Sequence, residues 1–359
     1  TRDIVLLEET YIKSSIVNKN NVNYGIIDIP KFYIDFDNQS NRDAAKDLKT
    51  EIIRLKEQDI KGLIIDLRNN GGGALKTVVE MAGMFIKNGP VVQVKYFDKE
   101  KQVLSDRDRS VLWSGPLVIL VNEGSASASE ILAAAMQDYK RAIIIGGNQT
   151  WGKGTVQNIF PLNRMVRGNT NGDLGALRYT TQKYYRINGG SVQLEGVKSD
   201  INLPYRYKYI DYGERESENS LEWDEIDEVD YNTWQSNFDF DFAVERSNKR
   251  IKDSEYLRLV DENAKWIKSV RDNKIINLNY KKFKDELDQN SIITKKFNTL
   301  DDFSMNYNFK SLPYEINLIE GDSVLGLKRK RWHSSLNKDF YIDESLNVLS
   351  DLRASQFQN

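Results

Sequence analysis

PLVILVNEGSASASEILAAAMQDYKRAIIIG, residues 116–146, sets the expected fold class. Residues 116–122 form a short run that is almost entirely apolar, which is typical of a strand buried on both faces. A turn around Gly124 follows, then a helical pattern over residues 129–139 and a second apolar strand over residues 142–146. A strand, a helix and a strand in close succession predict a layered α/β domain.

The same alternation continues on both sides of this segment. Strand patterns cover residues 24–36, 62–67 and 91–97, and helical patterns cover residues 43–58 and 74–87. Beyond residue 155 only strands are expected, over residues 156–162 and 177–187, with Asn188-Gly189 as a hairpin turn before a strand over residues 191–195.

The composition changes after Pro204. Residues 205–250 are acidic and aromatic, and residues 253–359 have mostly helical patterns, with one apolar face formed by Leu257, Val260, Ala264 and Ile267. We therefore expect residues 1–208 to form an α/β core and residues 209–359 to form an appended, mainly helical region.

The residue counts exclude several kinds of chemistry. The 359 residues include no cysteine and one histidine, so a thiol nucleophile, a thiolate metal cluster and a histidine-rich zinc site are excluded. The chain has 51 Lys and Arg residues against 53 Asp and Glu residues, so it lacks the overall positive charge that attracts nucleic acid. The acidic stretch 223–230 lacks the glycine of a calcium loop and is expected to be a solvated face. His333, in a basic patch, is expected to be structural or on the surface. No metal or cofactor is expected.

Ser127 lies at the junction between a buried strand and a helix. A helix N-terminus supplies free backbone N–H groups and partial positive charge, so a serine there can act as a nucleophile beside an oxyanion site. The alternative is a capping box with Ser127 as N-cap and Glu130 at the third helical position. On local sequence alone, capping is favoured.

Lys153 lies in GNQTWGKGT, residues 147–155, which nearly matches a phosphate-binding loop. Gly154 replaces the hydroxyl residue that such a loop requires, and a strand rather than a helix follows, so a nucleotide site is excluded. Lys153 is then either an ordinary surface lysine or a desolvated amine. A desolvated lysine has a lowered pKa and can serve as the general base for a serine.

Residues 69–73, NNGGG, follow the strand over residues 62–67. Three glycines let the backbone turn tightly and direct N–H groups at a ligand. A dinucleotide site is excluded, because Lys76 occupies the position of the last glycine in that motif.

Three segments, taken together, resemble the tail-specific, or C-terminal processing, proteases of the Ser-Lys peptidase family S41. These segments are GLIIDLRNNGGGAL (62–75), NEGSASASEILAAAMQDYKRA (122–142) and TWGKGTVQ (150–157). The resemblance continues through residues 179–204 and, more weakly, through residues 223–227 and 341–352, which are similar to the long, Prc-like bacterial branch. It implies a crotonase-like α/β core.

The resemblance also implies roles for particular residues. Ser127 matches the nucleophile, Lys153 the general base and Gln157 the glutamine that orients the lysine, while the N–H groups of Gly72 and Ala128 match the oxyanion hole. Asp138 matches an aspartate with a charge-relay role. Eleven residues along a helix place Asp138 roughly 16 Å from Ser127, which favours a structural role at the helix end as the alternative.

The function implied is a serine endopeptidase that degrades or processes proteins with unstructured, apolar C-terminal tails, in the bacterial periplasm. The family carries an N-terminal helical region and a PDZ domain, so we expect this chain to be the core and C-terminal region of a longer protein, with those domains as partners. The resemblance leaves room for a membrane-anchored adaptor. Two alternatives stay open: a non-catalytic or gated peptide-binding core that needs the PDZ region, and acyl-CoA chemistry, which relies on fold analogy alone.

Overall fold

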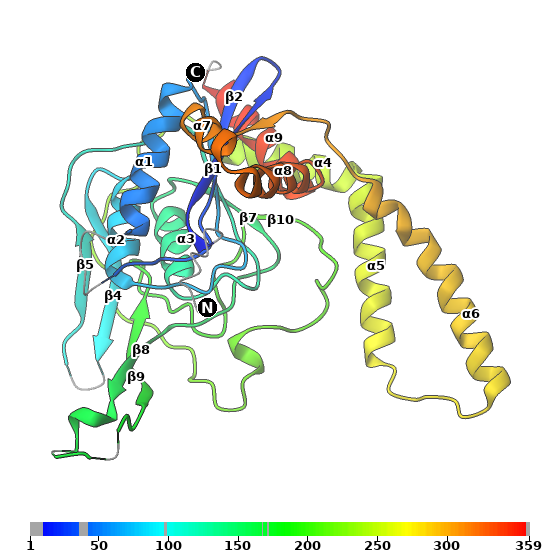
Figure 1. Ribbon diagram of the computed structural model, residues 1–359, viewed down its shortest axis with the longest axis horizontal. Helices are drawn as coiled ribbons and strands as arrows, with labels where there is room; N and C mark the ends of the chain where they lie inside the picture. Colours follow the sequence, from blue (N-terminus) through cyan, green and yellow to red (C-terminus); the bar gives the residue numbers. More distant parts are fainter. Residues whose placement is uncertain (1–9, 36–41, 97–98, 167, 171, 357–359) are drawn as a thin grey trace.

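The computed structural model describes residues 10–35, 42–96, 99–166, 168–170 and 172–356 (Figure 1). Its centre is a seven-stranded sheet in the order β10-β7-β6-β3-β2-β1-β11. Strands β2, β3, β6, β7 and β10 are parallel, whereas β1 is antiparallel to both of its neighbours. The strands are β1 (Lys13–Lys19), β2 (Val22–Asp28), β3 (Leu63–Asp66), β6 (Leu117–Leu120), β7 (Ile143–Gly146), β10 (Ile201–Asn202) and β11 (Phe309–Lys310).

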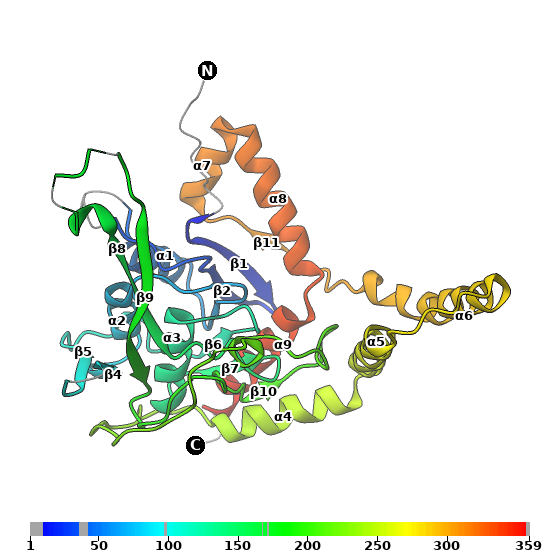
Figure 2. The same ribbon diagram turned by 90° about the horizontal axis from the view of Figure 1, so that it is seen from below.

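Helices cover both faces of this sheet (Figure 2). On one face, α1 (Ala44–Glu57), α2 (Leu75–Gly83) and α3 (Ala128–Asp138) pack against side chains such as Ile65 and Ile119. On the other face, α4 (Phe240–Asp253) and α9 (Phe340–Ser355) pack against Ile64 and Val118. Successive strand residues point to opposite faces, so a sheet covered on both sides requires the uninterrupted apolar runs seen in the sequence. The expected layered α/β fold class is confirmed.

A second, antiparallel sheet has the order β5-β4-β9-β8. Its strands are β4 (Gly89–Tyr96), β5 (Gln102–Asp106), β8 (Thr155–Pro161) and β9 (Ala176–Tyr185). The strand expected over residues 191–195 is wrong. Only Ser191 forms a bridge, with Tyr185, because the chain then turns at Leu194, whose φ is 64°.

The C-terminal region is mainly helical, as expected, and α5 with α6 forms a hairpin that projects from the core (Figure 1). The division into residues 1–208 and 209–359 stays a prediction. The two parts share one sheet, because β11 pairs with β1 and α9 covers the central strands. The remaining helices are α5 (Glu255–Asp272), α6 (Tyr280–Phe297), α7 (Pro313–Gly321) and α8 (Ser323–Asn337).

Candidate active site

The three motifs identified in the sequence meet at one edge of the core sheet. Strands β3, β6 and β7 are parallel neighbours. The glycine turn (residues 69–73), the serine turn (residues 124–127) and the lysine loop (residues 147–154) follow these strands in turn. Because the carboxyl ends of parallel strands lie at the same edge, all three segments converge there.

Ser127 immediately precedes α3 and has φ 57° and ψ −112°. An ordinary N-cap residue has extended backbone, and a positive φ is uncommon for serine. The N–H of Ser127 donates to Glu130 Oε2 at 2.7 Å, and the predicted capping box between these two residues is present. Backbone strain of this kind concentrates at functional sites, which favours a chemical role for Ser127 over capping alone.

Lys153 and Gln157 are brought together, as predicted. The Lys153 ammonium donates to Gln157 Oε1 at 3.2 Å. Burial lowers the pKa of Lys153, and the positive charge of Arg178 lowers it further, while Glu214 and Glu130 act in the opposite direction. In the described part of the chain, no carboxylate pairs with this ammonium. Lys153 is therefore suited to lose its proton more readily than a surface lysine.

Glu130 joins the serine turn to the lysine loop. Its Oε2 accepts the N–H of Ser127 at 2.7 Å and that of Lys153 at 3.1 Å. Its Oε1 accepts the N–H of Gly152 at 2.7 Å and the Thr150 hydroxyl at 2.6 Å. Glu130 is fully buried, and burial raises its pKa to about 7 against these hydrogen bonds. The sequence signal at Glu130 was that of a helix cap and gave no sign of this link.

Tyr184 on β9 makes a second link between the same two segments. Its buried hydroxyl lies 2.6 Å from the carbonyl oxygen of Lys153 and 3.2 Å from that of Ser127. Glu130 thus holds the N–H groups of Ser127 and Lys153, and Tyr184 holds their carbonyls. Nothing in the strand sequence around Tyr184 signals this contact.

The predicted oxyanion residues lie beside Ser127. A Cβ added at Gly72, whose φ is 99°, would lie 2.8 Å from Ser127 Cβ and 3.0 Å from the Ala128 nitrogen. The glycine turn therefore packs directly on the serine turn. The N–H of Ala128 is in the first turn of α3, where amides have no intrahelical acceptor. The N–H of Gly72 differs, because it donates to Asn70 Oδ1 at 2.8 Å.

Asp138 is not brought to Lys153 or Ser127, so the geometry does not support the charge-relay role implied by the resemblance. It lies at the last residue of α3, and its carboxylate accepts hydrogen bonds from Arg186 at 2.5 Å and 3.1 Å and from Asn188 at 3.0 Å. The continuous helix between the two residues keeps Asp138 away from Ser127. Asp138 instead fastens α3 to the end of β9.

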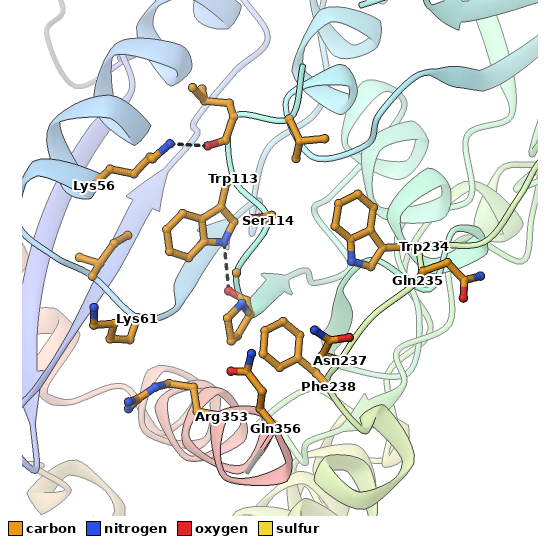
Figure 3. Close-up of a pocket in the computed structure, with 15 residues that line it drawn as sticks. Lys56, Lys61, Trp113, Ser114, Trp234, Gln235, Asn237, Phe238, Arg353 and Gln356 are labelled. Atoms are coloured by element: carbon orange, nitrogen blue, oxygen red, sulfur yellow. Dashed lines mark hydrogen bonds between the residues drawn. The ribbon is translucent and has the colours of Figure 1, made fainter. Parts of the chain in front are cut away.

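Other features of the described residues lie apart from this site. A cavity of about 650 Å³ opens at the amino ends of β3 and β6 and is lined by Lys61, Trp113 and Trp234 (Figure 3). The cavity contains neither Ser127 nor Lys153.

His333 lies on α8, and burial lowers its pKa. Within the described residues no carboxylates or histidines cluster to hold a metal ion, and no helix is long and apolar enough to cross a membrane.

Two protein-family profiles match most of this chain. The profile of peptidase family S41 matches residues 23–203, and that of the C-terminal domain of tail-specific proteases matches residues 207–354. The tail-specific protease of Haemophilus influenzae is 42% identical over 293 residues, which cover 80% of this chain and 41% of that protein. The carboxy-terminal-processing protease of Bartonella bacilliformis is 40% identical over 187 residues, covering 49% of this chain and 38% of that protein.

Among solved structures, the photosystem II D1 C-terminal processing protease has a TM-score of 0.45 at 27% identity, covering 54% of this chain and 48% of that one. The chain spans 41% and 38% of the length of the two curated relatives named above.

Proposed function

Since the chain belongs to peptidase family S41, we propose that it is the catalytic part of a serine endopeptidase with Ser127 as nucleophile and Lys153 as general base. The observation that carries this proposal is the double link between the two residues. The buried Glu130 carboxylate binds both of their N–H groups, and the Tyr184 hydroxyl lies within hydrogen-bond distance of both of their carbonyls. A structural serine and a surface lysine have no need of such a connection.

In the proposed reaction, the neutral amine of Lys153 accepts the proton of the Ser127 hydroxyl, and Oγ attacks the scissile carbonyl carbon. The N–H of Ala128 and the N–H of Gly72 stabilise the oxyanion of the tetrahedral intermediate. The N–H of Gly72 also donates to Asn70 Oδ1. The ammonium of Lys153 then protonates the departing amine as the peptide C–N bond breaks. Water, deprotonated by the same amine, hydrolyses the acyl-enzyme. Gln157 orients Lys153 throughout, through its bond at 3.2 Å.

The substrates we propose are proteins with unstructured, apolar C-terminal tails. Strand β8 follows the lysine loop and forms the edge of its sheet, where an extended chain can add by backbone pairing. The β8–β9 hairpin extends from the core (Figure 2) and exposes apolar side chains that include Ile159 and Leu177. An exposed apolar surface on the hairpin that follows the lysine loop suits an apolar peptide.

The test is turnover of an unstructured peptide with an apolar C-terminus. We expect Ser127→Ala and Lys153→Ala each to lower kcat/KM by at least ~1,000-fold. Lys198→Ala is the matched control, because Lys198 is an exposed lysine of the same core that pairs with Glu195. Unchanged cleavage by either active-site variant would refute the Ser-Lys mechanism.

A gated core is the second candidate, and one observation favours it. The Gly72 N–H is already bound to Asn70 Oδ1, so one predicted oxyanion donor is engaged. In this case the chain binds the peptide, and turnover requires further parts of the protein to adjust the glycine turn. Peptide binding to the chain without cleavage, with cleavage restored in a longer protein, would favour gating.

A further inference from the structure

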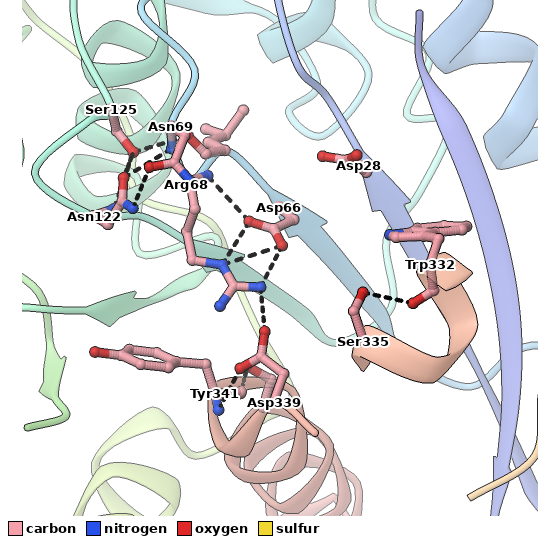
Figure 4. Close-up of polar contacts among 12 residues, drawn as sticks. Asp28, Asp66, Arg68, Asn69, Asn122, Ser125, Trp332, Ser335, Asp339 and Tyr341 are labelled. Atoms are coloured by element: carbon pink, nitrogen blue, oxygen red, sulfur yellow. Dashed lines mark hydrogen bonds and ion pairs between the residues drawn. The ribbon is translucent and has the colours of Figure 1, made fainter. Parts of the chain in front are cut away.

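Arg68 forms a partly buried cluster of charges with one carboxylate from the core and one from the C-terminal region (Figure 4). Its Nη2 lies 2.6 Å from Asp66 Oδ2 and 2.7 Å from Asp339 Oδ2, and its Nε lies 2.9 Å from Asp66 Oδ1. Asp66 is the last residue of β3, and Asp339 directly precedes α9. The cluster therefore connects two parts of the chain that are more than 250 residues apart.

Asp339 has two separable contacts. Its Oδ1 accepts the N–H of Tyr341 at 2.9 Å and so caps α9, while its Oδ2 binds Arg68. The ring of Tyr341 lies 5.5 Å from the guanidinium carbon of Arg68. Helix α9 is itself fixed, because side chains such as Leu346 are buried against the core sheet. The first turn of α9 thus holds Arg68 from a rigid support.

Arg68 immediately precedes the glycine turn. The next residue, Asn69, has φ 60°, and its N–H donates to Asn122 Oδ1 at 2.8 Å. The Asn122 amide donates in return to Asn69 Oδ1 at 2.9 Å. The backbone N–H of Asn122 also donates to the hydroxyl oxygen of Ser125, in the serine turn, at 3.0 Å. A displacement of Arg68 is therefore transmitted to both turns that flank the nucleophile.

We propose that Arg68 is a positioning residue, whose bond to Asp339 lets the C-terminal helical region set the geometry of the glycine turn at Gly72. This proposal rests on the proposed peptidase function, since the glycine turn supplies an oxyanion donor there. Asp66 alone already neutralises the guanidinium with a two-point contact. The second carboxylate is not required for charge balance, and what it adds is the connection to α9.

The discriminating variant is Asp339→Asn. Asparagine caps a helix as well as aspartate does, so the Tyr341 contact and the start of α9 are kept while the ionic contact with Arg68 is lost. Asp343→Asn is the matched control. Asp343 lies in the same first turn of α9, and its carboxylate is 3.5 Å from the Lys19 ammonium rather than near Arg68.

Two measurements on the full chain test the proposal. We expect Asp339→Asn to raise amide hydrogen exchange in residues 69–73 by about tenfold, with little change in Tm. We also expect roughly a tenfold fall in kcat on the unstructured peptide, with KM nearly constant, because small misplacements of catalytic groups slow the chemical step. Asp343→Asn should leave both quantities within about twofold of wild type.

Unchanged exchange in residues 69–73 of Asp339→Asn would overturn the proposal, and so would an equal change in Asp343→Asn. The exchange measurement does not depend on turnover. If Ser127→Ala retained full activity, the proposed function would fail while the exchange result still decided the role of Arg68. If Ser127→Ala were inactive and Asp339→Asn behaved as wild type in both measurements, only the present inference would fail.

Discussion

Replacing Glu130 with glutamine should disturb the positions of the proposed catalytic dyad, Ser127 and Lys153, without removing either reactive group. The carboxylate accepts four hydrogen bonds from Ser127, Thr150, Gly152 and Lys153 and donates none. Glutamine has nearly the same shape, but its amide nitrogen is a donor. At least one of the two carboxylate positions must then present a donor to groups that themselves donate.

The least costly placement puts the amide nitrogen where Oε1 now lies. The Thr150 hydroxyl can reorient there, but the N–H of Gly152 at 2.7 Å is left without an acceptor. A buried unsatisfied donor costs ~1–3 kcal/mol, and hydrogen bonds to a neutral acceptor are weaker than those to a charged one by about 1 kcal/mol each. Together these losses destabilise the reactive arrangement of Ser127 and Lys153 by about 3 kcal/mol, which corresponds to roughly a 100-fold loss of kcat/KM.

The pH dependence provides a second signature. Burial raises the pKa of Glu130 to about 7, so acidification protonates a group that must accept four bonds. Lys153, whose pKa is lowered by burial, must also be unprotonated to act as a base. Activity should therefore rise with pH through two deprotonations in wild type. In Glu130→Gln only the Lys153 deprotonation remains. On the acid side of the pH profile (its acid limb), the slope of log(kcat/KM) against pH should therefore fall from about 2 in wild type to about 1 in this variant.

The assay is kcat/KM on the apolar-tailed peptide from about pH 5 to about pH 9, with circular dichroism to confirm that each variant is folded. Glu123→Gln is a matched control, because burial also raises the pKa of Glu123, and its carboxyl group is hydrogen-bonded to the Tyr205 side chain rather than to Ser127 or Lys153. A Glu130→Gln enzyme with wild-type kcat/KM and an unchanged acid limb would refute the assigned role.

Three further variants test residues at the site and the predicted site residue Asp138. Tyr184→Phe removes only the hydroxyl near the carbonyls of Ser127 and Lys153 and should lower kcat by about tenfold, whereas Tyr185→Phe, whose hydroxyl binds Asp224, should not. Gly72→Ala would place Cβ 2.8 Å from Ser127 Cβ at a φ of 99°, so turnover should be lost in a chain that circular dichroism shows to be folded. Asp138→Asn weakens the contact with Arg186, so Tm and kcat should fall together while the acid limb of the pH profile stays as in wild type. A shifted acid limb in this last variant would restore a charge-relay role.

Much of the core could be predicted because local pattern and tertiary environment agree there. Residues 63–65 and 117–120 are apolar throughout, and the structure buries both faces of these strands between helices. The convergence of the glycine turn, serine turn and lysine loop also follows from sequence once the strands are parallel neighbours. The approach of Lys153 to Gln157 follows from their spacing along one short segment.

The links within the site could not be predicted, because they depend on contacts between distant residues. Glu130 reaches Lys153 across 23 positions, and Tyr184 reaches Ser127 across 57. The failed strand at residues 191–195 has the same origin. Leu194 turns toward the lysine loop and donates its N–H to the Gly152 carbonyl, and the Gln193 side chain accepts the N–H of Gly154. The requirements of the lysine loop thus override a local strand preference.

The buried charge of Glu130 has an electrostatic consequence for the proposed reaction. An ionised carboxylate beside the first turn of α3 opposes the oxyanion that the Ala128 N–H would stabilise, because like charges repel strongly at low dielectric. The opposition is offset in the transition state, where Lys153 has taken the Ser127 proton and carries positive charge next to both anions. Glu130 therefore favours the charged lysine of the transition state over the neutral lysine of the resting enzyme, and it also raises the pKa of Lys153 against burial. A base that is neutral at rest and charged at the transition state requires a compromise between these effects. The raised pKa of Glu130 means that its carboxylate is ionised, and accepts all four hydrogen bonds, at neutral to alkaline pH.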